Sequence, residues 1–308
     1  MQVIFGADWH FRYSNPKCRT DIYHETISKK LKWLKKLQKK LGIPILNGGD
    51  ITDKCLYVSP AEVVASINLL EEIPDMIGII GNHDLLHRSM DYLDKSIISI
   101  FIKSGKIKHI DGYYDLDEKT RVFGFDFGSE ITHPDPEDLI DGCNIAMWHG
   151  YVSKEFNPLF GKVVARDLLE EFPEFNILLT GDNHIRFIEE MDGRFLINPG
   201  SFLRMSANQI DFEPAVFVID TDEMSYEMIK VPIEVGVIST EHIQIEKDRD
   251  DRIESFVTNL DEEYEITDAF EKNLENYIAE NKHDENNKLL INKNVEKFIN
   301  RALEGDIG

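Results

Sequence analysis

Cysteines are few in this sequence, and no hydrophobic run is long. The three cysteines, Cys18, Cys55 and Cys143, lie far apart and form no C-x-x-C pair, which predicts free thiols in a reducing compartment rather than disulfide bonds. No stretch approaches the roughly 20 apolar residues that a helix needs to cross a bilayer, and the N-terminus lacks the charged region and cleavage site of a signal peptide. We therefore expect a cytoplasmic protein without a membrane partner.

Positive charge is also scarce. The 308 residues include 34 Lys and Arg against 57 Asp and Glu, which gives a net charge of −23. This balance argues against a protein that coats nucleic acid or an anionic membrane through bulk charge. It leaves room for a local basic groove or for a metal site that contacts phosphate. Hydrophobic residues make up 42% of the chain, which is enough for a sizeable core and excludes a mainly disordered protein.

Short apolar runs alternate with helical patterns in the first third of the chain. We expect strands at residues 2–7, 44–47 and 76–80, and helices at residues 21–41 and 60–72. This order of strand, helix, strand, helix, strand is typical of a parallel sheet with crossover helices.

Beyond residue 107 the expected strands are shorter and lie closer together. Three runs predict an antiparallel meander, at residues 108–110, 113–116 and 122–125. Two single strands and two hairpins follow, at residues 143–148, 176–180, 185–197 and 215–231, and Asp192-Gly193 forms a strong turn signal in the first hairpin. We predict an α/β (α+β) fold in which helices flank two sheets over residues 1–232.

The C-terminal part of the chain has a different composition. Residues 241–308 contain 19 acidic and 9 basic residues, a net charge of −10. Two apolar stripes at helical spacing predict a helical hairpin over residues 263–308, and residues 233–262 form a linker or a reduced cap. The stripes either pack on their own domain or dock on a partner.

Five of the expected strands end in residues that can bind metal ions. In α/β folds ligands bind beyond the carboxyl ends of the strands, so we expect these side chains to meet. A lone histidine or a lone Gly-Asp carries little weight, but five such strand ends are hard to explain as structure. The strand-end residues are Asp8, His10, Asp50, Asn82, His83, Asp84, His149, Asp182 and His184.

The chemistry of these side chains predicts the kind of site. A mixture of oxygen and nitrogen ligands suits Mn, Fe, Zn or Co better than Mg or Ca. Seven candidate ligands exceed the need of one tetrahedral ion, and they fit two ions about 3.5–4 Å apart. Asp50 is the natural bridge between the two ions, because a carboxylate has two oxygens to share.

The order of these motifs resembles the calcineurin-like metallophosphoesterase superfamily. The motifs D-x-H, G-D, G-N-H-D, H-G and G-x-x-H lie within residues 1–232. The resemblance implies a two-sheet metallophosphoesterase sandwich that holds two divalent metal ions. Its implied ligands are Asp8, His10, Asp50 and His184 for the first ion, and Asp50, Asn82, His149 and Asp182 for the second. One departure is plain, since the last motif of the superfamily is usually G-H-x-H and this chain has Gly181-Asp182-Asn183-His184.

The resemblance also implies a mechanism. A hydroxide that bridges the two ions would attack the phosphorus atom, and His83 would protonate the leaving oxygen or stabilise the transition state. We expect Asp84 either to orient His83 or a metal-binding histidine, or to cap the turn that follows it.

Two local segments resemble a narrower group. Asp8-Trp9-His10-Phe11 and Gly49-Asp50-Ile51-Thr52-Asp53, together with the acidic C-terminal hairpin, resemble the SbcD family of DNA nucleases and its phage recombination-nuclease relatives. This implies an exonuclease or endonuclease subunit in DNA recombination and repair, acting in the host cytoplasm if the chain is phage-encoded. It implies Mn as the metal, with Fe, Zn or Mg as alternatives. The implied partners are DNA, an SbcC-like ABC ATPase that binds the C-terminal helices, and a second copy of the chain.

Basic residues near the metal motifs are candidates for contacts with the substrate phosphates. They are Arg12, Arg88, Arg186 and Arg204. Two other functions remain open at this point. The chain could be a stand-alone phosphoesterase that acts on nucleotides or phosphoproteins, or a non-catalytic scaffold with the same fold.

Overall fold

The computed structural model describes residues 1–53, 59–156, 163–241, 243–244 and 247. The chain divides into two compact units, Met1–His242 and Ile243–Gly308. The expected helical hairpin at 263–308, most of the expected linker at 233–262 and Cys55 lie outside the described residues. Cys18 and Cys143 are buried free thiols, as the sequence predicts. None of the helices in the described part combines the length and the apolar character that crossing a bilayer requires.

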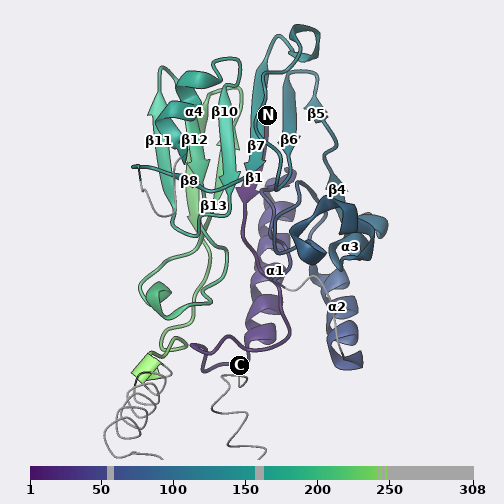
Figure 1. The fold of residues 1–308 in the computed structure, drawn as a ribbon, viewed down its shortest axis with the longest axis vertical. Coiled ribbons are helices and arrows are strands. Elements are labelled where there is room, and N and C mark those ends of the chain that lie inside the picture. The colour runs from purple at the N-terminus through teal and green to yellow at the C-terminus, as the bar shows by residue number, and fades with distance from the viewer. Residues whose placement is uncertain (54–58, 157–162, 242, 245–246, 248–308) are drawn as a thin grey trace, which may run out of the picture. The chain divides into compact units, whose positions relative to one another are not determined.

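The first sheet has six strands and contains the crossover units expected from the sequence (Figure 1). Four of its strands run parallel and include one edge of the sheet, whereas the two strands at the opposite edge are added antiparallel. In spatial order the strands are β14 (Ser225–Lys230), β13 (Ala215–Asp220), β1 (Gln2–Gly6), β2 (Ile45–Asn47), β3 (Met76–Gly78) and β4 (Ile107–His109). The helices between them are α1 (Tyr23–Leu41), α2 (Pro60–Glu72) and α3 (Ile98–Lys103).

The second sheet also has six strands. In spatial order they are β11 (Phe187–Met191), β12 (Arg194–Asn198), β10 (Ile177–Gly181), β7 (Cys143–His149), β6 (Thr120–Phe125) and β5 (Tyr113–Asp117). A short parallel pair, β8 (Val152–Ser153) and β9 (Val163–Val164), precedes α4 (Ala165–Glu171). Short 3₁₀ helices lie at Leu86–Arg88, Met90–Lys95, Pro136–Asp138 and Ala207–Gln209. The predicted two-sheet fold flanked by helices is confirmed.

The expected antiparallel meander is wrong in part. β4 pairs in parallel with β3 in the first sheet, so among the three strands of the expected meander only β5 and β6 pair antiparallel, and they do so in the second sheet. Ile107 and Ile110 are both buried, but they belong to cores on opposite sides of the first sheet. The chain changes sheet just after them, at Gly112, whose φ of 78° is left-handed. Short apolar runs close together cannot show such a change of sheet.

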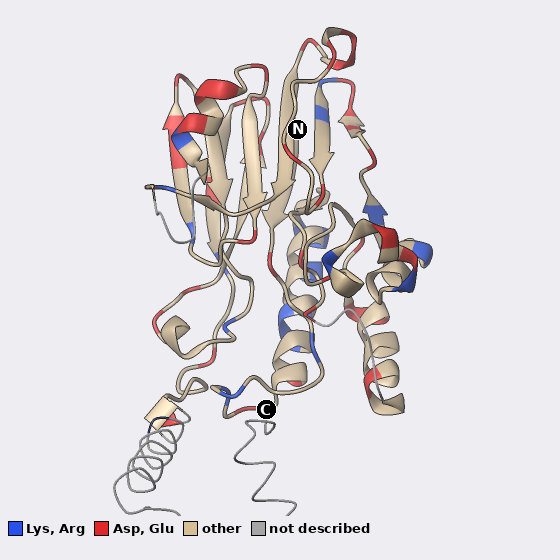
Figure 2. Cartoon of the chain, viewed as in Figure 1, with Lys and Arg blue, Asp and Glu red and all other residues tan. Residues whose placement is uncertain are grey.

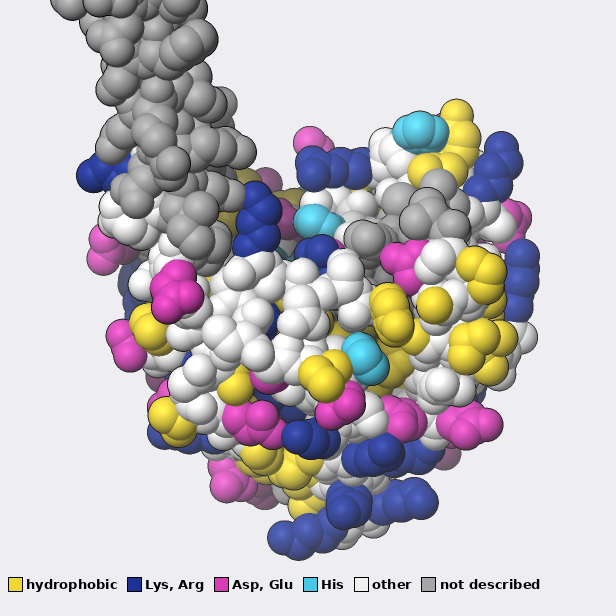
Figure 3. Space-filling model, turned by 90° about the horizontal axis from the view of Figure 1, so that it is seen from below, with side chains coloured by type: hydrophobic (Ala, Val, Ile, Leu, Met, Phe, Trp, Pro, Cys, Tyr) yellow, Lys and Arg dark blue, Asp and Glu magenta, His cyan; other side chains and the backbone are white. Residues whose placement is uncertain are grey.

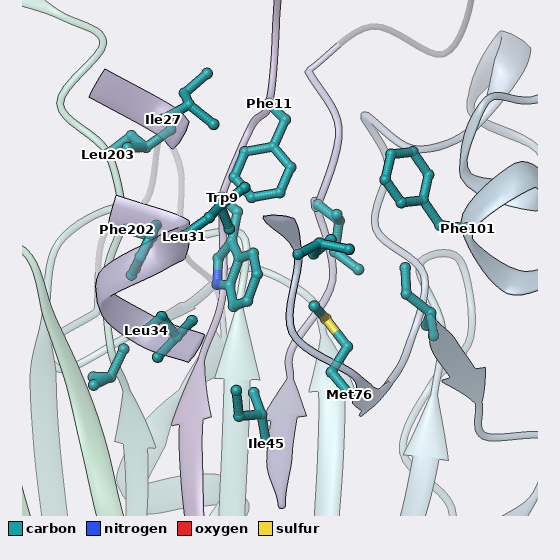
Figure 4. Packing of buried hydrophobic residues seen from close by; sticks show 14 of the residues in the cluster. Trp9, Phe11, Ile27, Leu31, Leu34, Ile45, Met76, Phe101, Phe202 and Leu203 are labelled. Atoms are coloured by element: carbon teal, nitrogen blue, oxygen red, sulfur yellow. The ribbon is translucent and has the colours of Figure 1, made fainter. Parts of the chain in front are cut away.

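Alternation along β1 explains how the layers pack. Val3 and Phe5 point into the core between the two sheets, whereas Ile4 points to the core between the first sheet and the helices. This alternation follows from the two-residue period of a strand. On the helix side Leu31 and Leu34 of α1 pack near Trp9 (Figure 4). A third core lies between the second sheet and α4.

Trp9 anchors the loop that follows β1. Its ring stacks on Phe202, with centroids 5.1 Å apart, and tilts against Phe11 at 5.5 Å. Both Trp9 and Phe11 are fully buried, so they form part of the wall of the core and do not stack on a substrate. Their packing fixes the backbone on both sides of His10.

Local signals explain where the two long helices begin and end. α2 begins with a capping box, in which the Ser59 side chain accepts a hydrogen bond from the Glu62 N–H and Glu62 accepts one from the Ser59 N–H. Pro60 occupies the first turn. α1 ends at Gly42, whose left-handed backbone lets its N–H donate to the Gln38 carbonyl.

One buried lysine of α1 has an unusual environment. Lys30 is only 5% exposed. Burial lowers its pKa to about 7, and the nearby positive charges of Arg19 and Arg204 lower it further, against the attraction of Asp21 and Glu234. An unfolded lysine keeps a pKa near 10.4. Between pH 7 and about pH 10 the unfolded chain therefore binds more protons at this position, and stability rises with pH.

We predict that Lys30→Met removes this part of the pH dependence. Between pH 7 and pH 9 the free energy of unfolding of the variant should rise by about 2 kcal/mol less than that of the parent protein. Urea unfolding at both pH values measures the difference, and Lys36→Met, at an exposed position of the same helix, serves as the control. An equal rise with pH in the parent and in Lys30→Met would contradict the prediction.

Candidate metal centre

Five parallel strands bring the predicted site residues together. β1, β2 and β3 of the first sheet and β7 and β10 of the second end at the same edge of the sandwich. Hydrogen bonds join the two sheets there, from the Asp182 N–H to Asp8 Oδ1 at 3.0 Å and between His149 Nδ1 and the Gly48 carbonyl at 2.7 Å. Residues separated by more than 170 positions thus form one cluster.

One group of possible metal ligands contains Asp8, His10 and His184. Each offers one ligand atom, and these atoms lie within 4.8 Å of one another. His10 Nε2 and His184 Nε2 are 2.9 Å apart, and His10 Nε2 lies 3.9 Å from Asp8 Oδ1. Two imidazole nitrogens this close, beside a buried carboxylate, are positioned to share a cation.

A second group contains Asp8, Asp50 and His149. His149 Nε2 lies 3.5 Å from Asp50 Oδ2. The amide of Asn82 is 3.1 Å from His149 Nε2, and the amide orientation that satisfies its neighbours directs the nitrogen to Asp50 at 3.0 Å. Since His149 Nδ1 is held by the Gly48 carbonyl, its Nε2 is the atom left to face the group.

Asp50 lies between these groups. It also belongs to a third group, with His10 and His83. Its Oδ2 lies 3.7 Å from His10 and 3.5 Å from His149, and its Oδ1 accepts a hydrogen bond from the His83 backbone N–H at 2.7 Å. This central position is the one expected for a bridging carboxylate.

The backbone of the site is strained. Asp8, His10, Asp50 and Asp182 have positive φ angles, of 53°, 47°, 52° and 79°. Residues with a side chain rarely adopt this conformation, and such strain gathers at functional sites, where surrounding packing enforces it. Four of the seven predicted ligands therefore have backbones that fold stability alone would not favour.

Two glycines make room for the cluster. A Cβ atom on Gly81 would lie 2.1 Å from Asp50 Oδ1, and one on Gly49 would lie 2.4 Å from His149 Nδ1. Neither Asp50 nor His149 has free space to move, because both are buried. We infer that a side chain at either glycine would displace a candidate ligand.

Burial and mutual charge shift the pKa values strongly. Burial raises the pKa of Asp8 to about 8, with Asp50 adding to the shift and His149 opposing it. Burial acts to lower the pKa of His149, but Asp50 and Asp8 outweigh it and raise the value to about 10. Burial would raise the pKa of Asp50, yet His149, His10 and His83 hold it below its usual range. Burial lowers the pKa of His10 to about 3.

These residues fit two divalent ions. The donors are carboxylate oxygens and imidazole nitrogens, a set that suits transition metals. His10 Nδ1 is buried and has no hydrogen-bond partner among the described residues, while Nε2 of the same ring faces the candidate ligands. In the absence of metal, the raised pKa values of Asp8 and His149 favour protons on both side chains. Bound cations would replace these protons and balance the negative charge of the carboxylates. The assignment of ions to particular ligands stays a prediction.

Asp182 takes a less central place than the other predicted ligands. Its N–H donates to Asp8, and burial raises the pKa of its carboxyl group. Its carboxylate is not part of the three close groups found among the described residues. Its predicted role as a ligand of the second ion is therefore still a prediction.

The structure shows a different task for Asp84 from either one expected. Its buried carboxylate accepts hydrogen bonds from the N–H groups of Ile51, Thr52 and Gly81 and from the Thr52 hydroxyl. It therefore fastens the loop after β2 to the loop after β3. This cross-link holds Asp50 and Asn82 at their positions, and none of the hydrogen bonds goes to a histidine.

Asp53 was not among the predicted site residues, although it lies close to them. Its Oδ1 is 3.7 Å from His10 Nδ1 and 3.6 Å from His83 Nδ1. The His83 ring lies edge-on to that of His10, with centroids 4.8 Å apart, and its side chain is 36% exposed. The signal that could have identified Asp53 is its place three residues after Asp50, in the same loop.

The four arginines expected to bind phosphate have different surroundings. Arg204 is wrong as a substrate contact, because it is 4% exposed and donates to the Ile210 and Glu234 carbonyls. Arg12 is paired with Asp53. Arg186 donates to the Glu213 carbonyl and lies over the Phe212 ring, and Arg88 is exposed. Sequence proximity to a metal motif does not show which way an arginine side chain extends.

Comparison with known proteins identifies the family. Residues 1–186 match the model of the calcineurin-like phosphoesterases. Among curated proteins, none matches the chain.

Three solved structures are similar to the chain. A candidate 5′-nucleotidase from Staphylococcus aureus, in complex with α-ketoglutarate, has 15% identity and a TM-score of 0.48, over 81% of this chain and 58% of its own length. The chain thus spans little more than half of that protein. An archaeal phosphodiesterase has 14% identity and a TM-score of 0.37, over 75% and 99%. The calcineurin-like phosphoesterase YfkN from Bacillus subtilis has 13% and 0.43, over 78% and 92%. Because the family match covers more than half of the sequence and the site geometry agrees with it, the chain belongs to the calcineurin-like phosphoesterase family.

Proposed function

We propose that the chain is a metal-dependent phosphodiesterase that serves as the DNA exonuclease or endonuclease subunit of an SbcCD-like recombination and repair complex. The observation that carries the phosphodiesterase part is the buried cluster around Asp50, with the part-exposed His83 beside it. The motifs Asp8-Trp9-His10-Phe11 and Gly49-Asp50-Ile51-Thr52-Asp53 support the nuclease part, through their resemblance to the SbcD family.

Each group of this site would have a role in phosphodiester hydrolysis. When bound, two divalent ions, Mn in this proposal, would supply an activated water and neutralise charge on the phosphate. The ions would be held by Asp8, His10, Asp50, Asn82, His149, Asp182 and His184. His83 would donate a proton to the leaving oxygen. Its Nδ1 faces Asp53, which leaves Nε2 as the nitrogen for this transfer.

A second function is a stand-alone phosphoesterase that acts on nucleotides or phosphoproteins. The surroundings of the arginines favour it, because Arg204, Arg12 and Arg186 are held by protein groups. Charges of both signs mix over much of the face in Figure 3, while basic side chains gather toward one edge. A small substrate needs fewer cationic contacts than a DNA strand does. The near-complete set of predicted ligands and its strained backbone argue against a non-catalytic scaffold, and only Asp182 in place of the usual histidine favours one.

Two protein partners belong to the proposal. An SbcC-like ABC ATPase would bind the acidic segment at residues 263–308, which lies outside the described residues. A second copy of the chain would pack on α2, which buries polar residues and exposes apolar ones. Glu62 and Ser66 are buried on this helix, while Val63, Val64 and Ile67 are exposed by 44%, 57% and 54%. An apolar outer face of this kind is typical of an interaction surface.

We predict that the purified chain degrades linear DNA in the presence of Mn²⁺, alone or with its ATPase partner. His83→Ala and Asp50→Ala should each lower the rate at least about 100-fold, since each removes a group needed for proton transfer or metal binding. Nucleotide release from labelled DNA measures the rate, and a panel of small phosphate esters runs in parallel. Intact DNA under both conditions would exclude the nuclease, and rapid hydrolysis of small esters without a partner would favour the stand-alone enzyme.

We predict that metal binding releases about two protons per chain at pH 7, because Asp8 and His149 must give up theirs to become ligands. Affinity for Mn²⁺ should rise from pH 6 to pH 8 by at least about tenfold. Calorimetry in buffers of different ionisation enthalpy counts the protons. His149→Gln should release fewer, while His133→Gln, at an exposed pair with Glu174, should match the parent. Binding that is independent of pH would contradict the prediction.

We predict that Ile67→Glu and Val64→Glu convert a dimer into a monomer. Both positions are exposed, so a charge there should leave the fold intact while its desolvation opposes association. Sedimentation velocity reports the mass, and circular dichroism checks the fold. A monomeric parent protein would refute the proposed pairing on α2.

A further inference from the structure

The loops that follow β1 and β2 lie side by side and are joined through their backbones. The Phe11 N–H donates to the Ile51 carbonyl at 2.8 Å, and the Asp53 N–H donates to the Phe11 carbonyl at 3.1 Å. Phe11 and Thr52 form an isolated parallel bridge. Arg12 and Asp53 follow directly on these two loops. Their backbones are therefore fixed relative to each other before their side chains meet.

The two oxygens of Asp53 face different partners. Oδ2 forms an ion pair with Arg12, at 2.9 Å from Nη1. Oδ1 is the atom that approaches two ring nitrogens, His10 Nδ1 at 3.7 Å and His83 Nδ1 at 3.6 Å. The side chain of Asp53 is only 13% exposed. Arg12 therefore holds one end of the carboxylate, and the other end lies between a candidate metal ligand and the candidate proton donor.

All three nitrogens of the Arg12 guanidinium are engaged within the protein. Nη1 contacts Asp53, while Nε and Nη2 donate to Ser14 Oγ at 3.3 and 3.0 Å. A planar guanidinium group that has partners on both sides has a defined orientation. This arrangement differs from that of an arginine that waits for a substrate phosphate with a free edge.

The histidines need such an acceptor. His10 Nδ1 is buried and has no hydrogen-bond partner among the described residues. Metal-binding histidines almost always donate the other ring N–H to a carboxylate, a carbonyl or water, and this contact fixes the ring and its tautomer. Asp53 Oδ1 is the carboxylate oxygen that faces Nδ1 in His10 and in His83 alike. Hydrogen bonds at such sites often shorten only when the site is loaded.

We propose that Arg12 is a positioning residue that acts through Asp53 on His10 and His83 together, and that it is not a contact for the substrate. By holding Oδ2, Arg12 keeps Oδ1 between the two Nδ1 atoms. One carboxylate then orients a metal ligand and the proton donor at once. The kinetic part of this inference rests on the proposed phosphodiesterase activity, and the orientation of the rings does not.

The kinetic test uses bis(4-nitrophenyl) phosphate with Mn²⁺. Arg12→Gln should lower kcat about 10- to 100-fold, which is the range for residues that orient a metal ligand. It should leave KM within about twofold. Arg12→Lys should recover part of the loss, because it restores the ion pair without the planar guanidinium group. Asp53→Asn should lower kcat similarly, and Arg12→Gln should add little to it, as expected for residues that act in series.

The spectroscopic test needs neither metal nor activity. In metal-free protein the ¹⁵N ring signals of His10 and His83 should shift in Arg12→Gln and in Asp53→Asn. Arg121→Gln is the matched control, since Arg121 forms a similar pair with Asp115 at 2.6 Å outside the site, and it should change neither these signals nor kcat.

Three results would overturn the proposal. They are a raised KM with unchanged kcat in Arg12→Gln, full additivity of the two substitutions, and histidine signals that do not change. A parent protein that hydrolyses no phosphodiester would refute the proposed function alone, because the ring signals would still test the role of Arg12.

Discussion

The structure depends on buried charges that need compensation. Asp8, Asp50 and His149 are almost completely buried and offer ligand atoms within 4.8 Å of one another. Such a cluster is costly unless opposite charges balance it. Without metal, protons supply the balance, which explains why the pKa values of Asp8 and His149 are raised to about 8 and about 10. The same requirement makes the cluster a place for cations.

The cluster also joins the two sheets. Asp8 belongs to the first sheet and accepts a hydrogen bond from Asp182 of the second, and His149 of the second sheet is held by the Gly48 carbonyl of the first. Apolar packing beneath, with Trp9 stacked on Phe202, holds the strained loops in place. Strain at a functional site persists only when its surroundings enforce it. The core and the site therefore stabilise the same backbone conformation.

The sequence predicted the main strands and helices from hydrophobic periodicity, and it predicted the metal cluster from the residues at the strand ends. Parallel strands deliver their ends to one edge, so the meeting of Asp8, His10, Asp50, Asn82, His149 and His184 followed from the pattern alone. The sequence did not show in which direction individual side chains point. Arg204 extends into the protein, Asp84 turns to backbone N–H groups, and Asp53 turns toward two histidines. The change of sheet after β4 also depends on tertiary packing, since the two cores on either side accept equally apolar residues.

The cations of this acidic chain, whose net charge is −23, are unevenly distributed. Figure 2 shows Lys and Arg along α1 and acidic residues on β11 and α4. Three cations serve the protein itself: Arg12 holds Asp53 beside the site, Arg204 binds backbone carbonyls, and Lys30 is buried with a lowered pKa. Cations held in this way are not free to neutralise phosphates, and affinity for DNA depends on the number of phosphates neutralised. If DNA is the substrate, bound metal and a partner must supply the missing positive charge.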